Sequence, residues 1–376
     1  MNFGFTDEQE LLRSEVRKFL DERCPLEEVR RITEAKGPGY SPELWKEIAE
    51  LGWTGLVIPE EHGGAGLGWV DWVVLLEETG RSLFPSPLLS NTLAAADIRA
   101  GGNPAQQARW LPGLARGTEI GSLVLREAAD ASAAPVPGIE GRRQQQGWRL
   151  SGEQHGVPDL AAATLLVVPF RSGPAPEDLR LAVLDAQARG LRTRESPGMD
   201  LTKRMGSLQL DDVPLAEEEV LGALPSPPAA LARLLDLAAA AVTAEMVGAA
   251  EAALACTVRY ARERVQFGSP IGRYQGVKHP LAEMYVDLES FKSLLYYAAW
   301  CLDESPEEAP RFVSMAKAYA SDAFARIGID AVQLHGAVGY TWEYDPHLYL
   351  KRSKWARAMY GDAHHHYARV AALGGL

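Results

Sequence analysis

The chain has 376 residues, of which 47% are hydrophobic and 23% are charged, and its formal net charge at pH 7 is −12. This length exceeds the usual size of a single core, and the composition is ordinary for a globular protein, so we expect two or three domains. The acidic balance argues against nucleic acid as the main partner, because binding to a phosphate backbone requires a basic surface.

The cysteines and the first residues bear on the cellular compartment. Cys24, Cys256 and Cys301 lie far apart without C-x-x-C spacing, which disfavours a disulfide framework or a cysteine metal site and predicts a cytoplasmic protein. The N-terminus, MNFGFTDEQELL, turns polar at once and lacks the pattern of a secretory signal. Because no run of 18 uninterrupted apolar residues occurs, we expect no transmembrane helix and no membrane partner.

Residues 1–117 have the pattern of a helical domain. Thr6 to Gln9 fits a capping box, in which the first and last side chains satisfy free N–H groups at a helix start. Ser41-Pro42 predicts a second helix start, with Gly52 as its stop. A glycine-rich loop, Glu61 to Gly68, precedes a further helix over Val70 to Thr79.

Residues 118–226 predict a small β domain. Short apolar runs are separated by Gly, Pro and Asp, which is typical of antiparallel strands. The runs are Leu123 to Leu125, Thr164 to Val168 and Leu181 to Leu184. Arg142 to Gln146 has no apolar period, so we expect an exposed loop there.

Residues 227–376 return to long helices after a proline-rich boundary. One apolar stripe follows helical spacing. It consists of Met284, Leu288, Phe291, Leu295 and Ala298. The order along the chain is therefore helical, then β, then a helical bundle.

Two short motifs in the last region have the residue types of a nucleotide site. Arg264-Val265-Gln266-Phe267-Gly268 ends an alanine-rich helical pattern, and the planar guanidinium of its arginine suits a pyrophosphate. The second motif, Gln333 to Gly339 (QLHGAVG), places a polar side chain beside small residues, where backbone approaches a nucleotide closely.

Together the motifs and the domain order resemble the acyl-CoA dehydrogenase family over nearly the whole chain. Each matching phrase alone is weak, whereas all of them in order are specific. The phrases are Pro59 to Gly64, Trp110-Leu111-Pro112, Tyr260 to Ile271, Gln275, and Gln333 to Thr341.

The resemblance implies a mainly α fold with an N-terminal helical domain (1–117), a middle β barrel (118–226) and a C-terminal four-helix bundle (227–376). It also implies an FAD-dependent oxidoreductase of lipid catabolism that acts on an acyl-CoA substrate. Dimers or dimers of dimers are implied, with an electron-transferring flavoprotein as acceptor. In the family the arginine and the Gln-x-x-Gly-Gly segment reach FAD that a neighbouring subunit mainly binds.

Carried over residue by residue, the family pattern assigns FAD contacts to one set of positions here. They are Arg264, Phe267, Gln275, Gln333, His335 and Gly336. Each has a plainer interpretation as a solvated side chain, a packed histidine or a helix junction. Ala337 replaces a glycine that is usual in the family.

The family's flavin-ring segments match poorly. The Thr-Glu-Pro-x-x-Gly-Ser loop corresponds to Arg126 to Ser132, where only Glu127 and Ser132 remain as candidates. The Trp-Ile-Thr segment corresponds to Gly156-Val157-Pro158. Gly156 has no ring to stack on the flavin, and Pro158 has neither a hydroxyl nor a backbone N–H to donate.

The catalytic base of the family is absent from both of its usual positions. Family chemistry needs a carboxylate that removes the α-proton of the thioester while the β-hydrogen leaves as hydride to the flavin. One usual position is Tyr360 here, counted without gaps from Lys351 and Lys354, and the other is Ala238. A tyrosine with an ordinary pKa near 10 is poorly matched to this role.

Two carboxylates are candidate substitutes for the base. Asp362 lies two residues past the usual base and otherwise is expected to cap a helix. Glu245 lies about two turns from Ala238 on the same helix face and otherwise is expected to pair inside the bundle. The adjacent histidines 364–366 point in different directions on a helix, so we expect no metal site.

Three interpretations of function stay open at this point, besides a related flavin oxidase or monooxygenase of the same fold. In the first, the chain is a subunit of a heteromer and contributes Arg264 and the Gln333 segment to FAD whose ring and base a homologous subunit supplies. In the second, it is a self-sufficient homo-oligomeric dehydrogenase with Glu245 or Asp362 as the base. In the third, it is a CoA-binding or scaffolding protein without flavin.

Overall fold

The computed structural model describes residues 4–125, 137–222 and 226–375. It divides into two compact units, each built from discontinuous segments. Unit 1 contains Met1–Arg31, Trp69–Phe84 and Ala239–Leu376, and unit 2 contains Ile32–Gly68 and Pro85–Ala238. The type of element changes close to residues 118 and 227, and the division into three domains stays a prediction.

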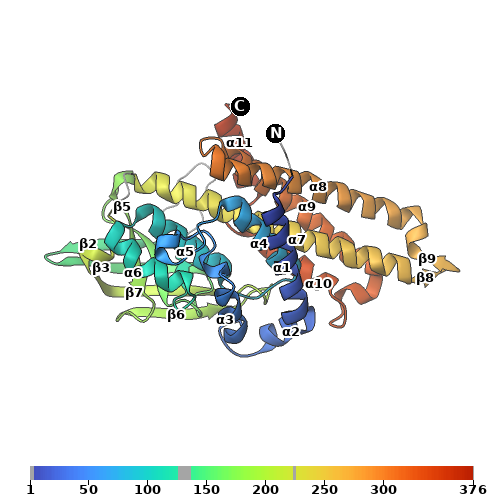
Figure 1. Ribbon diagram of the computed structural model, residues 1–376, viewed down its shortest axis with the longest axis horizontal. Coiled ribbons are helices and arrows are strands. Elements are labelled where there is room, and N and C mark those ends of the chain that lie inside the picture. Colours follow the sequence, from blue (N-terminus) through green and yellow to red (C-terminus); the bar gives the residue numbers. More distant parts are fainter. Residues whose placement is uncertain (1–3, 126–136, 223–225, 376) are drawn as a thin grey trace. The chain divides into compact units, whose positions relative to one another are not determined.

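Unit 1 is helical (Figure 1). Its N-terminal helices are α1 (Asp7–Arg23), most of α2 (Leu26–Glu34) and α4 (Trp69–Arg81). Its C-terminal helices are most of α7 (Pro227–Glu263), α8 (Gln275–Glu304), α9 (Ala309–His335), α10 (Pro346–Ala358) and α11 (Ala363–Gly374). The short strands β8 (Val265–Gln266) and β9 (Ser269–Pro270) and the 3-10 helices η5 (Ile271–Arg273) and η6 (Gly336–Tyr340) connect them.

Local sequence signals explain where several of these helices begin and which face they bury. Thr6 and Gln9 form the predicted capping box of α1. Ser41 accepts a hydrogen bond from the Leu44 N–H and so caps α3 (Pro42–Glu50) of unit 2. The predicted stripe of α8, from Met284 to Ala298, is buried, and α8 packs along α9.

Ion pairs join two N-terminal helices of unit 1 to each other, and close backbone packing joins one of them to the C-terminal bundle. Arg13 of α1 lies 2.9 Å from Glu77 of α4, and Arg17 lies 2.7 Å from Glu78. A Cβ atom at Gly248 of α7 would overlap the backbone of α4 at Glu77, so the two helices approach more closely than a side chain allows.

Unit 2 combines helices with a sheet. Its helices are α3, α5 (Leu88–Gly101) and α6 (Pro104–Ala115), with short 3-10 turns η1 (Trp53–Gly55), η2 (Glu60–His62), η3 (Pro176–Asp178) and η4 (Glu217–Glu219). Its strands are β1 (Gly121–Leu123), β2 (Ile139–Gln144), β3 (Gly147–Pro158), β4 (Leu165–Arg171), β5 (Leu179–Asp185), β6 (Leu191–Ser196) and β7 (Met205–Leu215).

The seven strands form one sheet in the order β1-β4-β2-β3-β7-β6, and β5 pairs with β4. Most neighbours are antiparallel, but β4 runs parallel to both β1 and β2. Leu150, Leu166, Phe170, Leu208 and Val213 are fully buried in its core. The predicted mainly α fold with a central β domain is therefore confirmed, with a curled sheet in the middle of the chain.

The prediction of a loop over Arg142 to Gln146 is wrong in part. Residues up to Gln144 belong to β2 and pair with β3, although their side chains are exposed as expected. This hairpin end is solvated, so its strands lack the alternation of apolar and polar residues that identifies a half-buried strand. Arg143 lies over the Trp148 ring, at 4.9 Å from the ring centroid.

Helix α7 is apolar enough for a membrane span by length and mean hydropathy, which is 1.4 over its most apolar window. In the structure, 89% of that window is buried inside the protein. The apolar side chains of α7 therefore pack against protein, as those of a core helix do.

Candidate functional site

The first nucleotide motif forms a small hairpin after the end of α7. Strands β8 and β9 pair through two residues each, and the turn between them contains Phe267 and Gly268, both with positive φ. The Ile271 N–H donates to the Arg264 carbonyl at 2.8 Å, which closes the hairpin. The Arg264 side chain is exposed, and Phe267 is 94% exposed. The hydrogen-bonded hairpin therefore exposes to solvent both residues that are predicted to contact FAD, Arg264 and Phe267.

The second motif ends α9. Gly336 has φ 66°, and a Cβ atom built there would have no neighbour within 4 Å. Gln333 and Gly336 are exposed, as is Gln275 at the start of α8. An exposed glycine backbone beside an amide side chain is suited to close approach by a phosphate or an adenine.

His335 lies differently from the rest of this set. It is 5% exposed, and its ring stacks on Tyr260 with a centroid distance of 4.4 Å. Its Nδ1 is 2.7 Å from the Ala331 carbonyl, and burial lowers its pKa. Because Tyr260 lies one turn before Arg264, this stack brings the ends of α7 and α9 together. His335 thus positions the two motifs, and its predicted contact with FAD stays a prediction.

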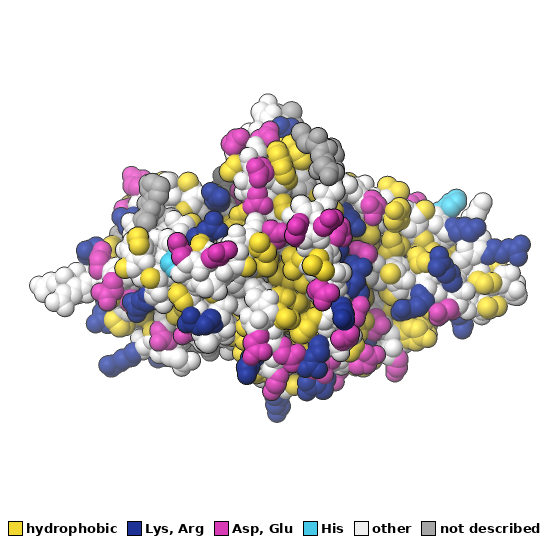
Figure 2. Space-filling model, viewed as in Figure 1, with side chains coloured by type: hydrophobic (Ala, Val, Ile, Leu, Met, Phe, Trp, Pro, Cys, Tyr) yellow, Lys and Arg dark blue, Asp and Glu magenta, His cyan; other side chains and the backbone are white. Residues whose placement is uncertain are grey.

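Cations surround the hairpin end of unit 1. Figure 2 shows Lys and Arg side chains gathered there on the visible face. Arg262, Arg264, Arg273 and Lys278 are all exposed. Despite the acidic chain, this end therefore offers the local positive field that a diphosphate needs.

Unit 2 offers little to a flavin ring at the matching positions. Gly156 has φ 68° at an irregularity in the pairing of β3 with β7. Val157 is fully buried, and the Pro158 carbonyl accepts a hydrogen bond from Ser122 at 2.6 Å. A larger side chain at Gly156 is disfavoured by the positive φ, although a Cβ atom would meet only the end of Met205 at 4.0 Å. Ser132 and the rest of residues 126–136 lie outside the described residues.

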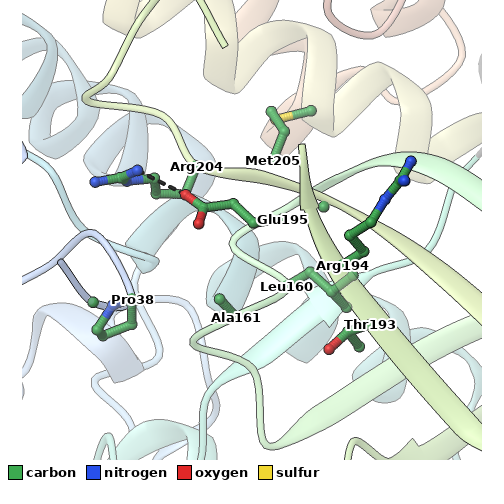
Figure 3. Close-up of a pocket in the computed structure, with 10 residues that line it drawn as sticks. Pro38, Leu160, Ala161, Thr193, Arg194, Glu195, Arg204 and Met205 are labelled. Carbon is green, nitrogen blue, oxygen red and sulfur yellow. Dashed lines mark hydrogen bonds and ion pairs between the residues drawn. The ribbon is translucent and has the colours of Figure 1, made fainter. Parts of the chain in front are cut away.

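A hollow of about 300 Å³, including space open to solvent, lies on unit 2 (Figure 3). Arg204 dominates it: its guanidinium lies 2.7 Å from Glu195 and donates to the Thr33 carbonyl at 2.9 Å. Leu160, Ala161 and Met205 supply apolar lining. The ion pair already occupies the polar side, so this hollow offers no catalytic carboxylate.

Glu245, the first candidate base, is buried in unit 1. It is 3% exposed, and its Oε2 lies 3.6 Å from Nη1 of Arg352, which is also fully buried. Ala238 is fully buried as well. Glu245 therefore pairs inside the helical bundle, as we expect of a residue with a structural role. Its role as the catalytic base stays a prediction.

Asp362, the second candidate, is exposed and caps α11. Its side chain accepts a hydrogen bond from the His365 N–H at 2.9 Å. Tyr360, at the usual base position, is 6% exposed and has φ 56°. The family's base position therefore holds a buried tyrosine. The carboxylate closest to it in sequence, that of Asp362, caps a helix.

A clamp that the sequence did not reveal holds the turn between α10 and α11. Lys317 of α9 is fully buried and donates to the carbonyls of Gly361, at 2.7 Å, and Arg357, at 3.3 Å. His366 Nε2 lies 3.0 Å from the Tyr360 carbonyl. A Cβ atom at Gly361 would meet the rings of His365 and His366 at under 3 Å. Residue 361 therefore has no room for a side chain, and the turn is fixed.

Among the described residues, no group of three His, Cys, Asp or Glu side chains could hold a metal ion. Of the histidine triplet, His364 is exposed and His366 is buried. The rings of His365 and His366 lie edge to face.

The residues present fit one end of an FAD molecule and not the other. The exposed arginine fork, the exposed amide and the open glycine suit a diphosphate and its nucleoside. At the described ring positions, a glycine and a proline offer neither a stacking ring nor a donor, and the two usual base positions hold Tyr360 and Ala238.

Comparison with known proteins supports the same family. Residues 6–118 match the acyl-CoA dehydrogenase N-terminal domain, and residues 228–373 match its C-terminal domain. The acyl-CoA dehydrogenase IpdE2 of Mycobacterium tuberculosis is 34% identical over 92% of this chain and 91% of its own length.

Solved structures agree. The ChsE4-ChsE5 complex from Mycobacterium tuberculosis superposes with a TM-score of 0.90 at 26% identity, over 100% of this chain and 99% of that one. A variant of the Tcur3481-Tcur3483 steroid ACAD gives a TM-score of 0.86 at 31% identity, over 98% of both chains. The chain therefore belongs to the acyl-CoA dehydrogenase family of FAD-dependent oxidoreductases.

Proposed function

We propose that this chain is one subunit of a heteromeric acyl-CoA dehydrogenase that removes the α and β hydrogens of an acyl-CoA thioester. The observation that carries the proposal is an uneven set of site residues. Arg264, Gln333 and Gly336, for the diphosphate end of FAD, are exposed, whereas the usual base positions hold Tyr360 and Ala238. A homologous subunit would supply the flavin-ring contacts and the base.

In this proposal the residues of this chain bind and orient the diphosphate end of FAD. When bound, FAD accepts the hydride that leaves the β-carbon. The Arg264 guanidinium would hold the diphosphate of FAD through its N–H donors, and the Gln333 amide would donate beside it. Gly336 leaves space for the nucleotide backbone, and Gln275 and Phe267 flank the same end of unit 1.

The relatives support two parts of this proposal. One solved relative is a complex of two differently named chains, and another is a steroid ACAD. We therefore propose a bulky, steroid-like acyl group on the CoA thioester, an electron-transferring flavoprotein as acceptor, and a cytoplasmic location.

The test compares the chain purified alone with the chain co-expressed with a homologous subunit. Alone, the chain should carry little FAD by its visible spectrum, and its mass in solution should not be that of the dimers or dimers of dimers expected for the family. Co-expression should give a yellow complex that acyl-CoA bleaches. A yellow homo-oligomer of the chain alone, bleached by acyl-CoA, would instead establish the self-sufficient enzyme. The absence of flavin under every condition would leave the scaffolding interpretation.

Variants separate the roles of single residues in that experiment. Arg264→Met should lower FAD retention at least about tenfold, the loss of one charge-assisted bidentate contact. Arg262→Met, which removes an equally exposed arginine two residues earlier, is the matched control. Glu245→Gln and Asp362→Asn should leave bleaching by acyl-CoA intact, and loss of bleaching in either folded variant would identify that carboxylate as the base.

A further inference from the structure

Two cations lie over one half-exposed aromatic ring in unit 1. Trp342, between η6 and α10, is 47% exposed. The Arg30 guanidinium lies 5.2 Å from its ring centroid, and the Lys351 ammonium lies 5.1 Å from it. The ring attracts each cation, but the two like charges repel each other. The Asp345 carboxylate pairs with Arg30 at 2.9 Å, so an anion beside Lys351 would relieve the repulsion that remains.

His347 lies in the same cluster and lacks a hydrogen-bond partner. It is 5% exposed, and its ring stacks on Trp342 with centroids 5.3 Å apart. Neither ring nitrogen bonds to any group in the described part of the chain. Buried polar groups are normally satisfied, so an unsatisfied pair of nitrogens indicates an external partner.

The charge state of His347 is set by its neighbours. Burial, with Lys351 and Arg30 close by, lowers its pKa to about 4, while Asp345 acts in the opposite direction. The imidazole is therefore neutral near pH 7 and carries one donor and one acceptor nitrogen.

The N-terminus of α10 lies at the same end of the cluster. Asp345 occupies the cap position, but its backbone is helical and its side chain caps nothing. Its carboxylate instead lies 2.9 Å from Arg30, which also donates to the Tyr344 carbonyl. The first turn contains no acidic side chain. Pro346 has no N–H, and the Leu348 N–H already donates to the Asp345 carbonyl at 2.9 Å, which leaves the His347 backbone N–H at the start of α10. A free N–H at a helix start attracts anions.

We propose that Lys351, His347 and the N-terminus of α10 bind a phosphate group. Lys351 supplies the charge, His347 donates a ring N–H, and the His347 backbone N–H adds a further donor. Arg30 holds the Asp345 carboxylate in its ion pair and so limits its repulsion of the ligand. Glu343, the other nearby acid, is fully exposed and screened by solvent. A phosphate suits the cluster better than a carboxylate because it offers more acceptor oxygens.

The first probe is inorganic phosphate, added to the full chain labelled with ¹⁵N-histidine. The His347 ring signals, assigned by their loss in His347→Gln, should shift saturably, and the pKa of His347 should rise with phosphate bound. His347 signals that do not move with phosphate would overturn the proposal without any variant.

Two lysine variants test the geometry. Lys351→Met should weaken phosphate binding at least about tenfold. Lys354→Met removes the same charge from the next turn of α10 and should change affinity less than about twofold. Equal weakening by both would show general screening and overturn the site. Because Lys351 is only half-buried, its variant should fold, which circular dichroism checks.

Competition then distinguishes the sources of the phosphate. If CoA displaces phosphate and 3′-dephospho-CoA does not, the site takes the 3′-phosphate of a CoA ligand. Displacement by both points to a pyrophosphate, and displacement by neither assigns the site to free phosphate. FAD retention is measured in parallel on the complex of the Lys351 variant with its co-expressed partner, so failure of the phosphate site and failure of the proposed FAD contacts are separate results.

Discussion

The carboxylate of Glu245 and the guanidinium of Arg352 face each other inside unit 1 at 3.6 Å, from helices far apart in the sequence. The two side chains are 4% and 1% exposed. The pair joins α7 to α10 and ties up the carboxylate that most resembles a displaced catalytic base. Mutation of this pair can therefore show whether Glu245 acts on stability or on catalysis.

Removing one member of this pair should destabilise the chain strongly. Arg352→Met leaves the Glu245 carboxylate buried without its counter-charge, and we expect a loss of about 3–5 kcal/mol in the free energy of unfolding. Glu245→Gln combined with Arg352→Met should cost less than the sum of the single changes. Urea unfolding followed by circular dichroism measures both.

The control for this prediction lies on the same helix. Arg357 pairs with Asp322 at 2.9 Å, but both side chains are substantially exposed. Arg357→Met should therefore cost about 0–1 kcal/mol. Equal losses in the free energy of unfolding for the two arginine variants would show that the buried Glu245–Arg352 pair stabilises the chain no more than the exposed pair does.

Gly361 and Gly268 offer a matched comparison of backbone and steric effects. Both have positive φ, but a Cβ atom meets the rings of His365 and His366 only at Gly361. Each Gly→Ala change carries a backbone cost of about 1–2 kcal/mol. Gly361→Ala should lose about 1–3 kcal/mol more from overlap. Equal losses in thermal unfolding would contradict the fixed turn described above.

Asp97 of α5 should make unit 2 less stable as pH rises. It is 2% exposed, and neither carboxylate oxygen has a hydrogen-bond partner among the described residues. Burial raises the pKa of its carboxyl from 3.8 to about 7. The folded state therefore keeps a proton that the unfolded chain loses between these values, so stability is full below about pH 4 and falls towards pH 7.

Asp97→Asn removes this titration. Each pH unit in that window corresponds to about 1.4 kcal/mol, so the stability of the variant relative to the natural chain should rise by a few kcal/mol from pH 4 to pH 7. Urea midpoints at several pH values provide the measurement. A difference between the two proteins that does not vary with pH would rule out Asp97 as the titrating group.

His366 should act in the opposite direction on the acid side. Burial, with Lys317 nearby, lowers its pKa to about 2, whereas the unfolded ring titrates near 6.5. Below about pH 6.5 the ring is protonated in the unfolded chain but stays neutral in the folded chain. The free energy of unfolding therefore falls as the pH drops below about 6.5. Between about pH 6.5 and 5 the loss should approach 2 kcal/mol.

His366→Gln tests this origin because it removes the titrating ring and keeps a side-chain donor for the Tyr360 carbonyl. Its unfolding midpoint should depend less on pH over the same range than that of the natural chain. An unchanged acid dependence would place the effect on another group, with His347 the next one to examine.

Much of the fold was predictable from residues close together in sequence. The capping box at Thr6, the cap at Ser41 and the stripe from Met284 to Ala298 were confirmed. Each depends on interactions within one or two helical turns, so local spacing suffices to predict it. The β2 hairpin end was missed because a strand solvated on both faces carries no alternation.

The sequence by itself determined the family, the two nucleotide motifs and the absence of a carboxylate from the usual base positions, since these depend only on which residues occur in what order. Only the tertiary structure decided that His335 stacks on Tyr260, that Glu245 pairs with Arg352, and that Lys317 and His366 hold the Tyr360 turn. Those contacts join residues of different helices and turns, and burial, which depends on the whole packed unit, sets their charge and geometry.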